Sequence, residues 1–307
     1  MSHKKVVFMG TPEFSVPILE AIAKSSYNVS CVYTQMPKKS NRGQRLNSSP
    51  IQKCAENLKL VLRNPKKLNS MEELEFIKKL SPDIVVVVAY GQLIPNFFLN
   101  IPKEGFINIH ASLLPKWRGA APIQRSIMSS DTETGISVMK IVEELDAGPV
   151  MKRVKIKIDE LSTAQELSKK LSNISSNLIV EILDEIFNKK LKFVEQNHKL
   201  STYAKKIKKD EAKIVWNESA KKILAKINGL NPNPGAWFEY KKIRHKIWRA
   251  KISEQSGPPG TILDNKFIIG CSNKSLEIIE IQKEGKKKLQ MKNFLLGLTF
   301  KQGDKLK

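Results

Sequence analysis

Cysteine is scarce in this chain of 307 residues, which has only three, at Cys31, Cys54 and Cys271. No two of them form a CxxC pair, and their number is odd. This usage excludes a disulfide framework and a cysteine-based zinc site. Unpaired thiols persist in a reducing compartment, so we expect a cytoplasmic location.

Long hydrophobic runs are also missing. No uncharged apolar run approaches the roughly 20 residues that a membrane-spanning helix needs. The first ten residues, MSHKKVVFMG, hold too short an apolar stretch for a secretory signal and lead directly into a predicted strand. We therefore expect neither a membrane partner nor a targeting segment.

Three common catalytic signatures are absent. The first predicted strand ends in GTP at 10–12 instead of GxGxxG, so a nicotinamide or flavin enzyme loses its main support. Gly10 could serve a tight turn or the close approach of a ligand. No Ser or Cys lies in a nucleophile-elbow motif, which favours direct group transfer over a covalent enzyme intermediate. Histidines and carboxylates lack ligand spacing, so we expect no metal.

Positive charge is what the chain has in excess, with a net charge of +23. Residues 201–307 contain 24 Lys and Arg against 10 Asp and Glu, whereas the rest contains 29 against 20. A basic second part suits a polyanion such as nucleic acid. A solvated surface produced by a biased composition explains the charge equally well, so charge alone leaves both interpretations open.

The first part of the chain alternates between strand and helix patterns. Strands are predicted at 4–11, 29–34, 58–63, 83–90 and 105–110, and helices at 12–24, from 50, at 70–80, from 122 and at 163–189. This alternation predicts an α/β fold with a Rossmann-like, doubly wound sheet. Two further strands, at 134–141 and 149–158, flank the turn ELDAGP. The basic segment 36–49 has no periodicity and is predicted to be a long functional loop.

The second part has a different pattern. One helix near 217–228 is followed by short strand-like runs at 246–252, 260–263, 267–270 and 276–281, separated by Gly- and Pro-containing turns. This spacing predicts a small β-barrel or sandwich. The predicted domains are 1–190 and 209–307, with 191–208 as linker. We expect the aromatic residues Trp216, Trp237, Phe238 and Trp248 in its core, and His3, His198 and His245 at the surface.

The stretch GFINIHASLLPKWRGAAP, at 105–122, holds the main candidate site. Asn108 and His110 are two apart on a predicted strand and therefore share a face. They lie near the carboxyl end of that strand, where ligands bind in open α/β sheets. A hydrogen-bonded core histidine with a satisfied amide is the alternative. Asp146, in the ELDAGP turn, could reach the same edge.

Amide, imidazole and carboxylate together make a chemically sensible group. The Asn108 amide can donate to an oxyanion, and His110 can bind that oxyanion or shuttle a proton. Asp146 can orient and polarise the imidazole or accept a proton. These roles suit attack by an incoming nucleophile on a carbonyl-type carbon.

Several motifs resemble one family. GTPEF (10–14), AYGQLIP (89–95), FINIHASLLPKWRGAAPIQ (106–124), TGISVMK (134–140) and LDAG (145–148) are similar to those of the methionyl-tRNA formyltransferase family, among the 10-formyltetrahydrofolate-dependent transferases. The likeness continues through STYAKKIKKDEAKIVW (201–216) and NPNPGAWF (231–238). It therefore covers nearly the whole chain.

The resemblance implies a reaction and its residues. A formyl group would pass from 10-formyltetrahydrofolate to the α-amino group of initiator methionyl-tRNA. Asn108, His110 and Asp146 match the catalytic trio of the family. The folate contacts would map onto two runs, Ala89, Tyr90, Gly91 and Gln92, and Ser112, Leu113, Leu114 and Pro115.

The resemblance also implies how tRNA is bound. The 36–49 segment is similar to a basic insertion that reaches toward the acceptor end, with Arg42 at the position of a key arginine. Lys38, Lys39 and Arg45 keep its charge, although MPKKSN departs from the usual sequence there. The second domain is similar to an OB-like β-barrel that binds tRNA. We expect the protein to act as a monomer.

Two rival functions remain at this point. One is a folate-dependent formyltransferase for a small amine, against which the basic 36–49 segment and the basic second domain argue. The other is an RNA-binding protein without catalytic activity. That protein would be indifferent to the loss of Asn108 or His110.

Overall fold

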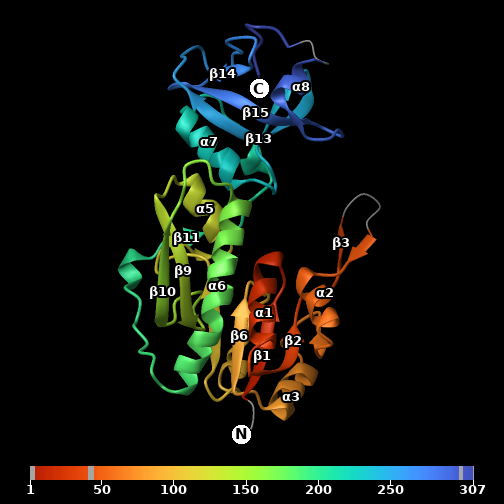
Figure 1. Cartoon of the computed structure of the whole chain (residues 1–307), viewed down its shortest axis with the longest axis vertical. Helices are drawn as coiled ribbons and strands as arrows, with labels where there is room; N and C mark the ends of the chain where they lie inside the picture. The colour runs from red at the N-terminus through yellow and green to blue at the C-terminus, as the bar shows by residue number, and fades with distance from the viewer. Residues whose placement is uncertain (1–3, 41–44, 297–299, 307) are drawn as a thin grey trace. The chain divides into compact units, whose positions relative to one another are not determined.

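A computed structural model of the chain describes residues 4–40, 45–296 and 300–306. The chain forms two compact units (Figure 1). The first contains residues up to 119 with 135–155 and 168–203, and the second contains 120–134, 156–167 and the chain from 204 onward. The second unit thus includes two segments from the earlier part of the sequence.

A seven-stranded sheet forms the centre of the first unit, in the order β10-β9-β7-β6-β1-β2-β5. Its strands are β1 (Lys5–Gly10), β2 (Asn28–Tyr33), β5 (Leu62–Arg63), β6 (Ile84–Val88), β7 (Phe106–His110), β9 (Glu133–Lys140) and β10 (Val150–Lys157). The pairs from β7 to β5 are parallel, whereas β9 pairs with β7 antiparallel. The Rossmann-like prediction is confirmed, with an antiparallel edge added and β5 shorter than expected.

Helices flank this sheet. They are α1 (Val16–Ala23) after the short η1 (Glu13–Ser15), α2 (Pro50–Asn57), α3 (Met71–Leu80), α4 (Asn96–Leu99) and α6 (Ala164–Phe187), with η2 (His198–Leu200) further on. Their starts follow local chemistry. The Ser49 hydroxyl accepts a hydrogen bond from the backbone N–H of Gln52, and Ser70 accepts one from Glu73. Each bond satisfies an N–H that the first turn leaves unpaired.

The central strand β6 shows how the sheet is covered. Ile84, Val86 and Val88 pack with apolar residues of α1, α2 and α6, whereas Val85 and Val87 pack with residues of α3 and α4. Figure 1 shows α1 and α6 on one face of the sheet. Helices on both faces bury every residue of β6, as its β-branched sequence predicts.

The segment 36–49 is not a simple loop. Its described residues form an antiparallel hairpin of β3 (Lys38–Ser40) and β4 (Arg45–Asn47), in which Lys39 pairs with Leu46. The loop prediction is therefore wrong for these residues, because six of them pair as strands in spite of their polar sequence. Arg42 lies outside the described residues.

The second unit is built on an antiparallel sheet in the order β12-β13-β15-β14, with β16 paired to β15. Its elements are α5 (Pro122–Met128), η3 (Asp210–Ala212), α7 (Ala220–Gly229), β12 (Trp237–Tyr240), β13 (Ile243–Ser253), β14 (Ile268–Gly270), β15 (Ser275–Lys283), β16 (Leu289–Gln290) and α8 (Met291–Leu295); two-residue strands β8 (Arg118–Gly119) and β11 (Tyr203–Ala204) precede it. The run 260–263, predicted as a strand, makes only isolated bridges. The antiparallel sheet expected for the second part of the chain is confirmed.

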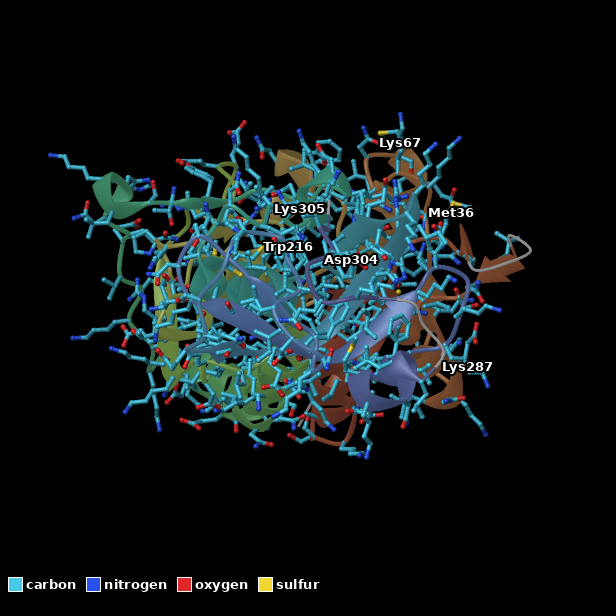
Figure 2. The ribbon with its side chains drawn as sticks, turned by 90° about the horizontal axis from the view of Figure 1, so that it is seen from above. Met36, Lys67, Trp216, Lys287, Asp304 and Lys305 are labelled. Atoms are coloured by element: carbon cyan, nitrogen blue, oxygen red, sulfur yellow. The ribbon has the colours of Figure 1, made fainter. Side chains whose placement is uncertain are left out.

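The core of the second unit corrects two expectations. Trp216 and Phe238 are buried as predicted, whereas Trp237 and Trp248, also predicted in the core, are only partly buried. Trp216 is labelled among the side chains of Figure 2. His245 was expected at the surface but is only 2% exposed, stacked on Phe238 with ring centroids 5.4 Å apart. Its Nδ1–H donates to the carbonyl oxygen of Ile243 at 3.0 Å. Burial lowers the pKa of His245.

Candidate active site

Asn108 and His110 lie at the carboxyl end of β7. The side chains of Ile107 and Ile109, which alternate with them, pack into the core beneath α1 and α6. Asn108 and His110 therefore point to the opposite face of the sheet. His110 is 6% exposed, so it is screened from bulk water.

The turn between β9 and β10 brings Asp146 to both residues. The Asn108 Nδ2 donates to Asp146 Oδ1 at 3.3 Å, and His110 Nδ1 lies 3.6 Å from Asp146 Oδ2. Three residues separated by up to 38 positions thus form one contiguous group. The structure brings together the three side chains that the sequence singled out.

The proton on the His110 ring can be assigned from its contacts. His110 Nε2 lies 2.8 Å from the carbonyl oxygen of Trp117, which can only accept, so Nε2 carries a hydrogen. In the neutral ring, Nδ1 would then face the Asp146 carboxylate with a lone pair. A further proton between Nδ1 and Oδ2 turns this contact from repulsive to attractive. Nδ1 is therefore the ring nitrogen that can accept a proton beside the carboxylate.

Backbone groups on either side of Arg118 hold this pair. The Trp117 carbonyl fixes His110, and the Gly119 N–H donates to Asp146 Oδ2 at 2.8 Å. Trp117 and Gly119 have φ of 63° and 109°, in the left-handed region that favours glycine. Sequence reasoning missed both groups, because main-chain donors and acceptors leave no side-chain signal; only the WRG run marks the place.

A buried polar network behind Asp146 was also missed. Arg118 is 1% exposed and donates to the side-chain oxygen of Gln196 from Nε at 3.2 Å and from Nη2 at 2.9 Å. Its Nη1 lies 3.1 Å from Glu144. Gln196 lies in the polar segment that was predicted to be a linker, so nothing in its surroundings marked it.

The run from Ala89 to Gln92 follows β6 at the edge of the same sheet. Hydroxyl groups of the first strand-to-helix turn fix it: Thr11 Oγ1 donates to the Tyr90 carbonyl at 2.7 Å, and Ser15 Oγ donates to the Val88 carbonyl at 2.6 Å. In the described part of the chain, the backbone N–H groups of Gly91 and Gln92 donate to no protein acceptor. This is the edge where strand order reverses, so these groups are placed for a ligand.

The Tyr90 side chain, in contrast, is part of the core. It is 1% exposed, and its hydroxyl has no hydrogen-bond partner. Burial raises the pKa of this phenol. Gly10 has a packing reason, since a Cβ there would lie 2.8 Å from Phe8 Cε1 and 3.0 Å from Ser15 Cβ.

The run from Ser112 to Pro115 forms a loop held by its own hydrogen bonds. The Ser137 hydroxyl accepts from the Leu114 N–H at 3.0 Å and donates to the Ser112 carbonyl at 2.7 Å. Ser112 and Leu114 are buried, whereas Leu113 and Pro115 are partly exposed. A ligand at this loop would therefore contact Leu113 and Pro115, with the other two residues shaping the backbone.

One face of the second unit is basic and contains two partly exposed tryptophans. Trp237 and Phe238 alternate on β12, and because Phe238 is buried, Trp237 faces outward, opposite Lys246 on β13. The Arg244 guanidinium lies 4.3 Å from the Trp237 ring centroid. We define the basic face as Lys213, Trp237, Lys241, Lys242, Arg244, Lys246, Trp248, Lys286 and Lys287. Within the described ranges, none of its cations forms an ion pair with a carboxylate.

The described residues contain neither a metal-binding cluster nor a membrane-spanning helix. Among residues 4–40, 45–296 and 300–306, no group of three or more His, Cys, Asp or Glu side chains could hold a metal ion. Across the same ranges, no helix combines the length and the apolar character needed to cross a membrane.

Comparison with known proteins places the chain in a family. The formyl transferase model matches residues 4–183, and the model of the formyl transferase C-terminal domain matches residues 206–299. The methionyl-tRNA formyltransferase of Pelagibacter ubique is 52% identical over 305 residues, which are 99% of this chain and 98% of that protein. That of Brucella ovis is 44% identical, over 95% of this chain and 97% of its own.

Solved structures share the fold at lower identity. An N-formyltransferase from Helicobacter canadensis, in complex with folinic acid and dTDP-3-aminofucose, aligns with a TM-score of 0.70 at 19% identity, over 92% of this chain and 99% of its own. Methionyl-tRNA formyltransferase from Clostridium thermocellum aligns with a TM-score of 0.59 at 18% identity, over 81% and 94%. By the match of both domain models and by its close full-length relatives, the chain belongs to the formyl transferase family, among the methionyl-tRNA formyltransferases.

Proposed function

We propose that this protein transfers the formyl group of 10-formyltetrahydrofolate to the α-amino group of initiator methionyl-tRNA, with Asn108, His110 and Asp146 as its catalytic residues. The observation that supports this assignment most is the position of the Asp146 carboxylate, which contacts Asn108 and His110 at the carboxyl edge of the sheet. The full-length likeness to the Pelagibacter ubique enzyme supports the choice of acceptor.

The reaction is a direct attack by the amine. The amine nitrogen forms a bond to the formyl carbon, and the carbonyl oxygen becomes the oxyanion of a tetrahedral intermediate. The amine proton passes to Nδ1 of His110, which faces Asp146 Oδ2 at 3.6 Å. The bond from the formyl carbon to N10 then breaks, N10 keeps the electron pair, and the proton taken from the amine is passed on to N10.

Asn108 and His110 stabilise the oxyanion. One N–H of Asn108 is directed at Asp146 Oδ1, which leaves its second N–H to donate to the developing negative charge. His110 adds positive charge close to the oxyanion once it holds the extra proton. Removal of a single oxyanion donor typically lowers turnover by about 10²- to 10³-fold.

The formyl donor would lie between the two loops at the sheet edge. The unpaired backbone N–H groups of Gly91 and Gln92 supply donors for a flat, polar ring, and Ala89 and Tyr90 give this run its shape. Leu113 and Pro115 supply apolar contact, while Ser112 and Leu114 hold their loop. These features fit a folate whose ring is bound mainly by the main chain.

Transfer RNA would be bound by two basic elements. The β3–β4 hairpin contains Lys38, Lys39 and Arg45, and Arg42 belongs to its connecting segment, which we propose to reach the acceptor end. The basic face of the second unit would contact phosphates, which position a nucleic acid without reading its bases. Its unpaired cations and the half-buried Trp237 suit both phosphates and a stacked base.

We further propose a functional division at 1–190 for catalysis and 209–307 for tRNA binding, joined by 191–208, and a monomeric protein in the cytoplasm. The three cysteines are free and buried, which fits a reducing compartment. Burial raises the pKa of Cys31 and Cys271 to about 12, so neither thiol is reactive at neutral pH.

A formylation assay with three acceptors tests this function. Charged initiator tRNA, a nucleotide amino sugar and glycinamide ribonucleotide are each incubated with 10-formyltetrahydrofolate and the protein. We expect turnover with the charged tRNA only. Turnover confined to a small amine would refute the proposed acceptor, and binding of tRNA without any turnover would favour the RNA-binding alternative.

A further inference from the structure

We propose that Gln196 and Arg118 are positioning residues for Asp146: the Arg118 guanidinium fixes the Gln196 amide, and that amide holds the turn from which the Asp146 carboxylate projects. The inference rests on the proposed role of Asp146. All the residues involved belong to the first compact unit.

The Gln196 amide binds both sides of the turn. Its Nε2 donates to the carbonyl oxygen of Asp146 at 2.9 Å and to that of Gly148 at 2.7 Å. Both hydrogens of the NH2 group are thereby used on main-chain acceptors two residues apart. Gln196 is 4% exposed, so water does not compete for these bonds.

Arg118 fixes which way the amide points. The Gln196 Oε1 accepts from Nε and Nη2 of Arg118, and a guanidinium has donors only. A flipped amide would set NH2 against the guanidinium and the oxygen against two carbonyls. One orientation is therefore imposed at both ends of Gln196, and it is the orientation that binds the turn.

The turn needs such support, because its backbone is unusual. Asp146 has φ of 49°, a left-handed conformation that is unfavourable for a residue with a side chain. Gly148 packs so tightly that a Cβ would lie 2.0 Å from the carbonyl oxygen of Lys140. The two carbonyl oxygens that Gln196 binds belong to these residues, so its bonds hold the strained conformation in place.

The consequence for catalysis is a matter of distance. Asp146 reaches Asn108 and His110 at 3.3 and 3.6 Å, so small shifts of the turn would separate them. Misplacement of a catalytic group by about 1 Å can cost about 10²-fold in rate. Loss of the Gln196 donors should therefore lower kcat while leaving substrate binding largely intact.

The substitution Gln196→Glu tests this proposal. It keeps the size of the side chain and an acceptor for Arg118, but it removes the two donors to the turn. We expect kcat to fall by about 10- to 100-fold, with KM for both substrates within threefold of wild type. In a protein that already has Asp146→Asn, the same substitution should change the residual rate by less than twofold, because it acts through Asp146.

The matched control is Asp83→Asn. Asp83 is also buried and bridges Lys5 and Lys103, but it lies at the opposite end of β6, so Asp83→Asn should lower the melting temperature and leave kcat within twofold. Unchanged kcat in Gln196→Glu, or an equal loss in the Asp146→Asn background, would overturn the proposal. If Gln196→Glu fails to fold, Arg118→Lys is tested in the same double-mutant cycle with Asp146→Asn. This substitution keeps the positive charge but removes the paired donors of the guanidinium. If the wild-type protein formylates another amine, the proposed acceptor is wrong. The role of Gln196 and Arg118 can still be tested, because the same double-mutant cycle can be run with that amine.

Discussion

The two compact units place their charged groups in opposite ways. In the first unit, Arg118 and His110 are nearly inaccessible to solvent, and each is held by contacts at 2.8–3.2 Å. In the second unit, Lys241, Lys242, Lys286 and Lys287 are exposed and make no ion pair with a described carboxylate. Buried groups are fixed by geometry, whereas the exposed ones contribute little more than charge.

This difference fits the two tasks that we propose for the units. Stabilising an oxyanion depends on donors that are already placed when the charge develops. Holding a polyanion depends on the number of cations near its phosphates, and tolerates mobile side chains. The comparison therefore predicts that single substitutions act strongly in the first unit and weakly in the second.

The largest effect should come from Asn108→Ala. Loss of its amide removes an oxyanion donor and a partner of Asp146, so we expect kcat to fall by about 10²- to 10³-fold. The dissociation constant for tRNA, measured by filter binding, should stay within threefold of wild type. Normal turnover in Asn108→Ala would show that this amide does not stabilise the oxyanion. The contrast between the two units would then lose its strongest support.

Arg42→Ala should have the next largest effect. A charge-assisted contact to the acceptor end is worth about 1.5–3 kcal/mol, so kcat/KM for charged tRNA should fall by about 10- to 100-fold. Folate binding, followed by fluorescence quenching, should not change. Normal kinetics with tRNA would show that the hairpin does not belong with the tRNA-binding elements.

Removing several cations of the basic face should have a smaller, graded effect. A variant with Lys241, Lys242, Lys286 and Lys287 changed to Ala should bind tRNA more weakly, with kcat at saturating tRNA unchanged. The slope of log affinity against log salt should decrease by about 0.7–0.9 for each phosphate that the variant no longer neutralises. A slope equal to that of wild type would mean that tRNA is bound elsewhere.

The smallest effect concerns stability and His245. Burial lowers the pKa of His245 below its usual 6.5, so the unfolded chain binds a proton that the folded unit does not. Stability should therefore decrease by about 1 kcal/mol as the pH falls from 7 to 5.5. His245→Phe, which keeps a ring against Phe238, should lose this dependence in thermal melts. Lys283 faces the same ring, and the same slope in the variant would assign the effect to other groups.

Much of the site could be predicted because it follows from strand alternation. Asn108 and His110 share a face by the period of two, and Asp146 lies in a turn between two recognisable strands. The chemistry of amide, imidazole and carboxylate then suggests their roles. The choice of formyl transfer came from the resemblance of the surrounding motifs.

Other features could not be predicted, for identifiable reasons. Gln196 lies 48 residues from Gly148, to which it donates, and a polar residue in a Lys-rich segment gives no sign of burial. The β3–β4 hairpin lacks the alternation that marks strands, since five of its six residues are polar and only Leu46 is apolar. His245 was misplaced because its neighbours are charged, although its own position faces the barrel core.

The contacts of Trp117 and Gly119 have a consequence for how this sequence can vary. Because His110 and Asp146 are held by peptide groups, neither bond is made by the side chain at position 117, although the φ of 63° there disfavours β-branched residues. The spacing is not free, since one inserted or deleted residue between 110 and 119 would withdraw both peptide groups at once. The geometry therefore constrains the number of residues in this stretch more strongly than the identity of the side chain at position 117.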